Sequence, residues 1–219
     1  MFPLALLNKS NSTTPVTTPV TVLDLQFTGA NGSTTFTDSS TYGATFTRTG
    51  SPTIQDNMGE FTSNGYYIRA PQPVAGLWEW GANDFEITGE FTINSVGGYR
   101  GIICQKNVPS IAGTFSISID AGYSNQLLLG INTSTGYKLV SHQTAPAANT
   151  LYTFKAARHG EYLRLWLDDI ESTTPVYIGN ATITPNVTDI TVGVVISPSA
   201  YYTLGGRVDN LKIVKFIPV

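Results

Sequence analysis

Two neighbouring segments with strictly alternating side chains constrain the fold of this chain most. In residues 152–158 and again in residues 162–168, apolar side chains occupy every second position. This period of two is typical of a half-buried β-strand. Gly160, in the connection, readily adopts the positive φ of a tight hairpin turn, and Asp168-Asp169 favour a second turn after the hairpin. The apolar positions are Tyr152, Phe154 and Ala156 in the first segment and Leu163, Leu165 and Leu167 in the second. The sequence therefore predicts a β-hairpin.

The rest of the chain predicts more strands of the same kind. Charged residues make up only 12% of the 219 residues, and no window has the apolar spacing of a helix. Regular alternation favours antiparallel strands with one packed face and one solvated face, and hence two sheets packed face to face. Strands are expected near 22–28, 34–37, 44–48, 59–62, 66–70, 85–94, 100–105, 114–119, 126–131, 137–142, 151–158, 162–168, 176–179, 189–196 and 207–216. The expected fold class is all-β, an antiparallel two-sheet β-sandwich with an extended N-terminal arm.

The hairpin also carries a family resemblance. Residues 152–169, YTFKAARHGEYLRLWLDD, resemble the second half of laminin-G-like domains of the concanavalin A-like lectin and glucanase superfamily. Residues 83–93 and 101–105 resemble earlier strands of that family, and residues 22–40 are similar to the opening of laminin-G-like modules in bacteriophage virion proteins. The resemblance covers roughly residues 22 to 217. It implies a concanavalin A-like jelly roll in which the opening strand, with Leu23 and Leu25, lies beside the closing strand, with Leu211 and Ile213.

The N-terminal part differs in composition from the rest. Residues 8–21 are rich in Ser, Thr and Pro, which predicts an extended linker. We therefore expect two parts, an arm of residues 1–21 and a jelly-roll domain of residues 22–219. The arm begins with apolar side chains, which either dock on the same chain or insert into a partner; we favour a partner and interpret them as particle anchors. These side chains are Phe2, Leu4, Leu6 and Leu7.

Composition argues against several function classes. The net charge of −3 and the scattered Lys and Arg side chains disfavour nucleic acid as a partner. Apolar runs are far shorter than the roughly 20 residues that span a bilayer, and the N-terminal residues lack the features of a secretory signal. The single cysteine, Cys104, is expected to be a small buried apolar residue.

Catalysis is not expected. The resembling glucanases place carboxylates at alternating positions of one strand, because glycoside hydrolysis needs two carboxyl groups facing one bond. Glu86 and Glu90 share a face but are separated by Thr88, and we interpret them as part of a solvated face. The histidines, His142 and His159, have no neighbouring pattern of a metal site or catalytic triad.

Carbohydrate binding is better supported by the sequence. A sugar-binding site combines aromatic faces for C–H surfaces with amide or carboxylate groups for hydroxyls, and the chain contains 11 Tyr and 3 Trp. The alternative for each tyrosine is ordinary packing, and Trp78 and Trp80 are expected to fill the core. The predicted contacts lie in loops or on outward faces. They are Tyr66, Tyr99, Tyr123, Asn125, Tyr137, Trp166, Tyr201 and Tyr202.

Calcium is a further possibility that the resemblance implies, since its relatives bind an ion near the sandwich rim. A calcium ion needs several oxygen ligands. The candidates are Asp38, Asp120 and Asp168, and the alternative for each is the capping of a turn.

Two functional interpretations remain open. The first is a bacteriophage virion protein, a capsid decoration or tail-tip module on the virion surface. It would be held by its arm to capsid or tail proteins, assembled as a homo-oligomer with a trimer favoured, and would bind host-surface polysaccharide weakly. The second is a free-standing extracellular lectin or adhesin of the same fold.

Overall fold

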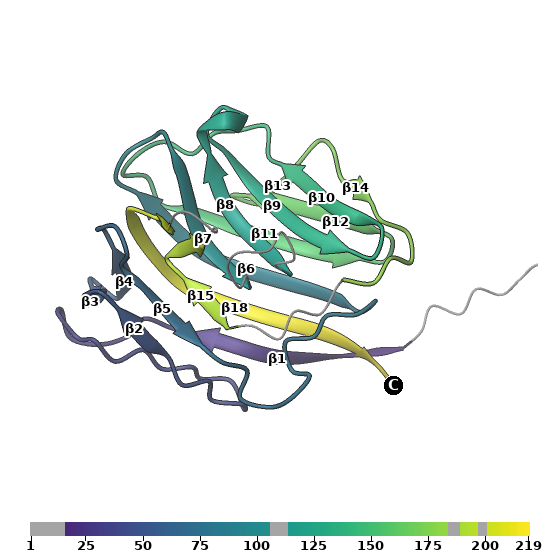
Figure 1. The fold of residues 1–219 in the computed structure, drawn as a ribbon, viewed down its shortest axis with the longest axis horizontal. Helices are drawn as coiled ribbons and strands as arrows, with labels where there is room; N and C mark the ends of the chain where they lie inside the picture. The colour runs from purple at the N-terminus through teal and green to yellow at the C-terminus, as the bar shows by residue number, and fades with distance from the viewer. Residues whose placement is uncertain (1–15, 106–113, 184–188, 197–200) are drawn as a thin grey trace, which may run out of the picture.

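The computed structural model describes residues 16–105, 114–183, 189–196 and 201–219, and these form an antiparallel two-sheet β-sandwich (Figure 1). The first sheet has the order β13-β12-β11-β6-β18-β4-β3, with β1 paired to β18 and β14 paired to β12. Its strands are β1 (Thr17–Leu25), β3 (Thr53–Gln55), β4 (Met58–Phe61), β6 (Asp84–Ile93), β11 (Tyr152–His159), β12 (Tyr162–Leu167), β13 (Ile170–Glu171), β14 (Val176–Tyr177) and β18 (Gly206–Pro218).

The second sheet has the order β10-β9-β8-β7-β15-β5-β2. Its strands are β2 (Thr47–Thr49), β5 (Tyr67–Ala70), β7 (Tyr99–Gln105), β8 (Phe115–Asp120), β9 (Gln126–Thr133), β10 (Gly136–Ser141) and β15 (Ile190–Val192). A short 3₁₀ helix, η1 (Ala121–Tyr123), follows β8. Two further strands, β16 (Val194–Ile196) and β17 (Tyr201–Thr203), pair with each other as a separate ribbon. The expected all-β sandwich is confirmed, and no helix in the described ranges is long and apolar enough to cross a membrane.

The predicted hairpin is present as β11 and β12. Phe154 pairs with Leu167 and His159 with Tyr162, and Gly160 in the turn has a φ of 58°. Leu163, Leu165 and Leu167 are buried, as the alternation predicts. Asp168 and Asp169 both have positive φ and form the next tight turn, which leads into β13.

The two ends of the domain lie side by side. Strand β1 pairs with β18 from Thr17 opposite Pro218 to Leu25 opposite Leu211, so the predicted pairing of the terminal strands is confirmed. Figure 1 shows the start of β1 next to the C-terminus. β1 begins at Thr17 and not at residue 22, because Thr and Val side chains suit a strand and the backbone of residues 17–21 pairs with β18. Residues 17–21 thus belong to the sheet and not to the linker.

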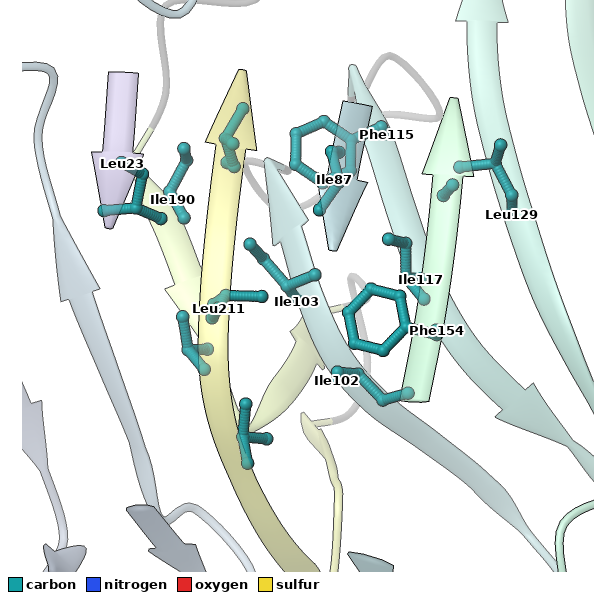
Figure 2. Packing of buried hydrophobic residues seen from close by; sticks show 14 of the residues in the cluster. Leu23, Ile87, Ile102, Ile103, Phe115, Ile117, Leu129, Phe154, Ile190 and Leu211 are labelled. Atoms are coloured by element: carbon teal, nitrogen blue, oxygen red, sulfur yellow. The ribbon is translucent and has the colours of Figure 1, made fainter. Parts of the chain in front are cut away.

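Apolar side chains from both sheets meet in one core (Figure 2). Leu23, Ile87 and Phe154 project from the first sheet toward Ile103 and Ile117 of the second. The Phe154 ring needs a glycine opposite it, because a Cβ on Gly89 would lie 2.8 Å from ring atom Cε1. This contact fixes the packing of β11 against β6.

Trp78 and Trp80 are each 1% exposed, which confirms the prediction that they fill the core. Both are held by Gln105, whose Oε1 accepts from Trp80 Nε1 at 2.6 Å and whose Nε2 donates to the carbonyl of Trp78 at 3.0 Å. Cys104 is buried, as expected. The Gln105 contacts attach the segment before β6 to the end of β7.

The segment near residues 34–37 is not a strand, which corrects the prediction. Its neighbour Asp38 is 7% exposed and accepts hydrogen bonds from the backbone N–H groups of Asp24, Ser40 and Ala44. The carboxylate holds residues 38–44 as a turn through Ser40 and Ala44, so Thr37 and Asp38 form only isolated bridges, to Thr45 and Leu25. The short strands β3, β13 and β17 are not predicted by the alternation, because each has only two or three residues.

Candidate functional site

Four tyrosines meet on the outward face of the second sheet. We call this surface the tyrosine face; its members are Tyr99, Tyr123, Tyr137, Tyr202, Ser116, Ser118, Asp120 and Gly130. The strands alternate cleanly here, since Ile117 and Ile119 of β8 are buried in the core while Ser116 and Ser118 point to the other side. Register aligns the outward positions, with Tyr99 opposite Asp120 and Ser116 opposite Gly130.

Tyr137 lies across β9 because Gly130 has no side chain. A Cβ at Gly130 would contact the Tyr137 hydroxyl directly and would lie 3.2 Å from Ser116 Oγ. The ring therefore covers the strand at this glycine, yet the residue is 56% exposed. Glycine within a strand often marks such a close approach. The result is an aromatic side chain lying over the sheet and open to solvent.

Tyr99 and Tyr202 form the opposite side of this face. The β16–β17 ribbon crosses β7 at Gly101, where an added Cβ would collide with the backbone nitrogen of Val195. Tyr202 of the ribbon meets Tyr99 edge to face, with ring centroids 4.8 Å apart. Ser118 Oγ donates to the Tyr99 hydroxyl at 3.2 Å, which fixes the phenol in place. The ribbon thus forms a raised edge beside an ordered pair of rings.

Tyr123 and Asp120 complete the tyrosine face at the end of β8. Asp120 caps η1, where its Oδ1 accepts from the backbone N–H of Gly122 at 2.8 Å, and Tyr123 is 47% exposed. Burial raises the pKa of Tyr137 to about 12, with a further contribution from the charges of Tyr99, Tyr123 and Asp120. Burial also raises the pKa of Tyr99, and hydrogen bonds with Ser118 and Ser116 partly offset this. Tyr99 and Tyr137 are therefore neutral donors at pH 7.

The arrangement combines aromatic rings with short hydroxyl groups and a carboxylate. A phenol ring offers an apolar face together with a polar hydroxyl. Exposed aromatic rings near serine and aspartate oxygens can contact both the C–H surface and the hydroxyls of a polyhydroxylated ligand. The sequence did not identify Ser116, Ser118 or Gly130 as site residues. Alternation with Phe115, Ile117 and Ile119 places the two serines on the outward face, and the signal for Gly130 is a glycine in an otherwise continuous strand pattern.

The other predicted sugar contacts lie elsewhere. Tyr201 is on the far side of the ribbon, where its ring stacks on Tyr67 with centroids 5.9 Å apart. Tyr66 packs against Gly50 at a different turn. Asn125 has a φ of 60° and forms the turn into β9, where its N–H donates to the carbonyl of Asp120. Trp166 projects from the first sheet, on the opposite side of the sandwich.

The three calcium candidates do not come together. Asp38 and Asp120 cap turns, and Asp168 Oδ1 accepts from the backbone N–H of Thr153 at 2.8 Å. Within the described ranges, no three His, Cys, Asp or Glu side chains cluster in a way that could hold a metal ion. The predicted anchors Phe2, Leu4, Leu6 and Leu7 lie outside the described residues.

No family model matches this chain, and no curated protein matches it in sequence. Solved structures do resemble it. Botulinum neurotoxin type C, whose cell entry is described as dependent on interaction with two ganglioside molecules, matches with a TM-score of 0.67 and 13% identity over 89% of this chain and 47% of the toxin chain.

The binding domain of botulinum neurotoxin serotype D matches with a TM-score of 0.66 and 14% identity, over 88% of this chain and 47% of that chain. The binding domain of botulinum neurotoxin DC, in complex with rat synaptotagmin II, matches with a TM-score of 0.64 and 14% identity over the same shares, 88% and 47%. The chain thus spans about half the length of these neighbours. None of the three is a laminin-G domain or a phage protein, and at this identity the likeness shows the fold alone.

Proposed function

We propose that this protein is a non-enzymatic carbohydrate-binding domain and that the tyrosine face is its binding surface. The observation that carries the proposal is the convergence of four tyrosines from four separate segments, β7, η1, β10 and the β16–β17 ribbon, on one sheet face. Exposed aromatic groups of this kind favour a binding role. The phenol hydroxyls and the carboxylate of Asp120 match the hydroxyls of a sugar.

The chemistry of the face also supports a role in binding and not in hydrolysis. Cleavage of a glycosidic bond needs two carboxyl groups facing the same bond. The tyrosine face contains one carboxylate, Asp120, and that group is engaged with the N–H of Gly122. The fold neighbours add support of the same kind, because they include toxin binding domains and a toxin that interacts with gangliosides.

A glycan array with the full chain tests this proposal. We expect at least one glycan to be retained, and we expect Tyr137→Ala to weaken its binding about tenfold, the typical effect of removing a central aromatic contact. Tyr177→Ala is the matched control, because Tyr177 is similarly exposed, at 59%, but lies on the first sheet. Binding that is absent from the array, or that is equally reduced by both substitutions, contradicts the proposal.

We further propose that this domain acts on a virion surface, where residues 1–15 hold it to capsid or tail proteins. The support is the resemblance of residues 22–40 to phage modules together with an apolar segment on a polar tether. Many copies on one particle raise avidity without a tight single site. The alternative remains a free-standing lectin or adhesin.

The virion role and the free-standing lectin role can be distinguished by measuring how much protein associates with particles, with and without residues 1–15. The deletion has to end before Thr17, because Thr17 already pairs with Pro218. The virion proposal predicts that the shortened chain keeps its glycan binding but no longer sediments with particles. Association that survives the deletion contradicts the anchoring role.

A further inference from the structure

The outward face of the first sheet contains a groove that the tyrosine face does not involve. Its volume is about 310 Å³, and it lies over β6, β11 and β12. Trp166 closes one end, and Thr88, Glu90 and Lys155 line its floor. Register explains their proximity, because Lys155 is directly opposite both Thr88 on β6 and Trp166 on β12.

A β-bulge in β18 shapes the other end of the groove. Asp209 pairs with Glu90 and Lys212 with Thr88, so two residues of β18 lie opposite the single residue Gly89. The bulge turns Leu211 into the core, at 0% exposure, and Asn210 out into the groove with a φ of 49°. Bulges commonly re-aim a side chain beside a functional site. Here the bulge adds an amide to the groove lining.

The polar groups of the groove are available for a ligand. Among the described residues, the carboxylate of Glu90 and the ammonium of Lys155 form no ion pair with another side chain. Lys155 Nζ instead lies 4.1 Å from the centroid of the Trp166 ring, a cation–π contact. The floor thus presents an acceptor, a donor, the hydroxyl group of Thr88 and an indole ring, while the Thr153 hydroxyl donates to Asp168 Oδ1 at 3.3 Å.

We propose that this groove is a second saccharide site that takes one neutral hexopyranose unit. Its volume is at the lower end of the range for small-molecule pockets, which suits a single sugar ring. Trp166 and the stem of Lys155 contact the C–H surface, while Glu90, Asn210 and the Thr88 hydroxyl bond the sugar hydroxyls. Two carboxylates, Glu90 and Asp169, outnumber the one ammonium in the lining, which disfavours an acidic sugar.

Tryptophan fluorescence offers a readout specific to this groove. The chain has three tryptophans, and Trp78 and Trp80 are 1% exposed, whereas Trp166 is partly open to solvent. The probes are the methyl glycosides of glucose, galactose, mannose and N-acetylglucosamine, with N-acetylneuraminic acid as the acidic sugar. We expect at least one neutral glycoside to change the fluorescence of the full chain at millimolar concentration.

Two variants decide whether that change comes from the groove. Glu90→Ala removes an unpaired surface carboxylate and is expected to weaken the response about fivefold or more. The control is Glu60→Ala, which removes a β4 carboxylate that is paired with Arg207 of β18, and it leaves the response unchanged. Tyr137→Ala also leaves it unchanged, so failure of the groove and failure of the tyrosine face are distinguishable. No response to any neutral glycoside, a stronger response to N-acetylneuraminic acid, or a response insensitive to Glu90→Ala overturns the second site.

Discussion

Arg158 shows how a single buried cation organises the connections of this sandwich. It is 2% exposed, and its guanidinium donates to the carbonyls of Gly160, Gly81, Ala181 and Gly179. Arg158→Met leaves the buried carbonyls of Ala181 and Gly179 unpaired, so we expect the free energy of unfolding to fall by about 3 kcal/mol. Urea unfolding measures this. Arg69→Met, at a side chain that is 53% exposed, is the control and should change stability by less than about 0.5 kcal/mol. Equal losses of stability in the two variants would contradict a stabilising role for the Arg158 hydrogen bonds.

The titration of Tyr137 tests the geometry of the tyrosine face at the level of one hydroxyl. The pKa of this phenol is raised from 10.0 to about 12 by burial and by neighbouring charges. The unfolded chain therefore loses this proton first, and the phenol's contribution makes stability fall as pH rises from about 10 to about 12. Because the pKa of Tyr99 is also raised, we expect ultraviolet titration to contain a late phenolate component that decreases by the amplitude of one tyrosine in Tyr137→Phe. If the late phenolate component has the same amplitude in Tyr137→Phe as in the unmodified chain, the packing of Tyr137 over Gly130 is contradicted.

Among the elements, the β16–β17 ribbon determines the shape of the tyrosine face. Its backbone passes so close to Gly101 that Gly101→Ala has to displace it, which separates Tyr202 from Tyr99. We expect a loss of about 1–3 kcal/mol in stability together with weaker glycan binding. Chemical denaturation and glycan titration measure the two effects. Gly29→Ala is the control, because the nearest atom to its Cβ is the end of the Ile54 side chain, at 3.1 Å, and its other near neighbours are side-chain atoms of Ser33. Full glycan binding by Gly101→Ala would show that the ribbon is not part of the site.

The elements also show what can be predicted from the sequence. Long alternating strands such as β6, β11 and β12 are predictable, because period two identifies the buried face directly. The pairing of β1 with β18 is implied by the family resemblance. The tyrosine face is not predictable as a unit, because its assembly depends on cross-strand register and on two glycines, Gly101 and Gly130, that allow close approach. Sequence reasoning selected Tyr99, Tyr123, Tyr137 and Tyr202 for their aromatic character but could not separate them from Tyr66 or Tyr201.

At the scale of the whole molecule, residues ahead of position 22 cover part of one edge of β18 in the first sheet. Residues 17–21 pair with residues 214–218 of β18. A chain that starts at residue 22 should therefore unfold at a lower temperature than one that starts at residue 16, and it should self-associate through the exposed edge of β18. Calorimetry and light scattering measure both. Equal stability of the two shortened chains would contradict the role of residues 17–21 in the sheet.

The central claim is that glycans bind the sandwich at the tyrosine face. Backbone amide chemical shifts, recorded by nuclear magnetic resonance during titration with a glycan selected on the array, test it most directly. The account predicts that the largest changes cluster at Tyr99, Ser116, Ser118, Gly130 and Tyr137. Changes confined to the turns around Tyr66 or to the edge strands β2 and β3, with these amides unmoved, would contradict it.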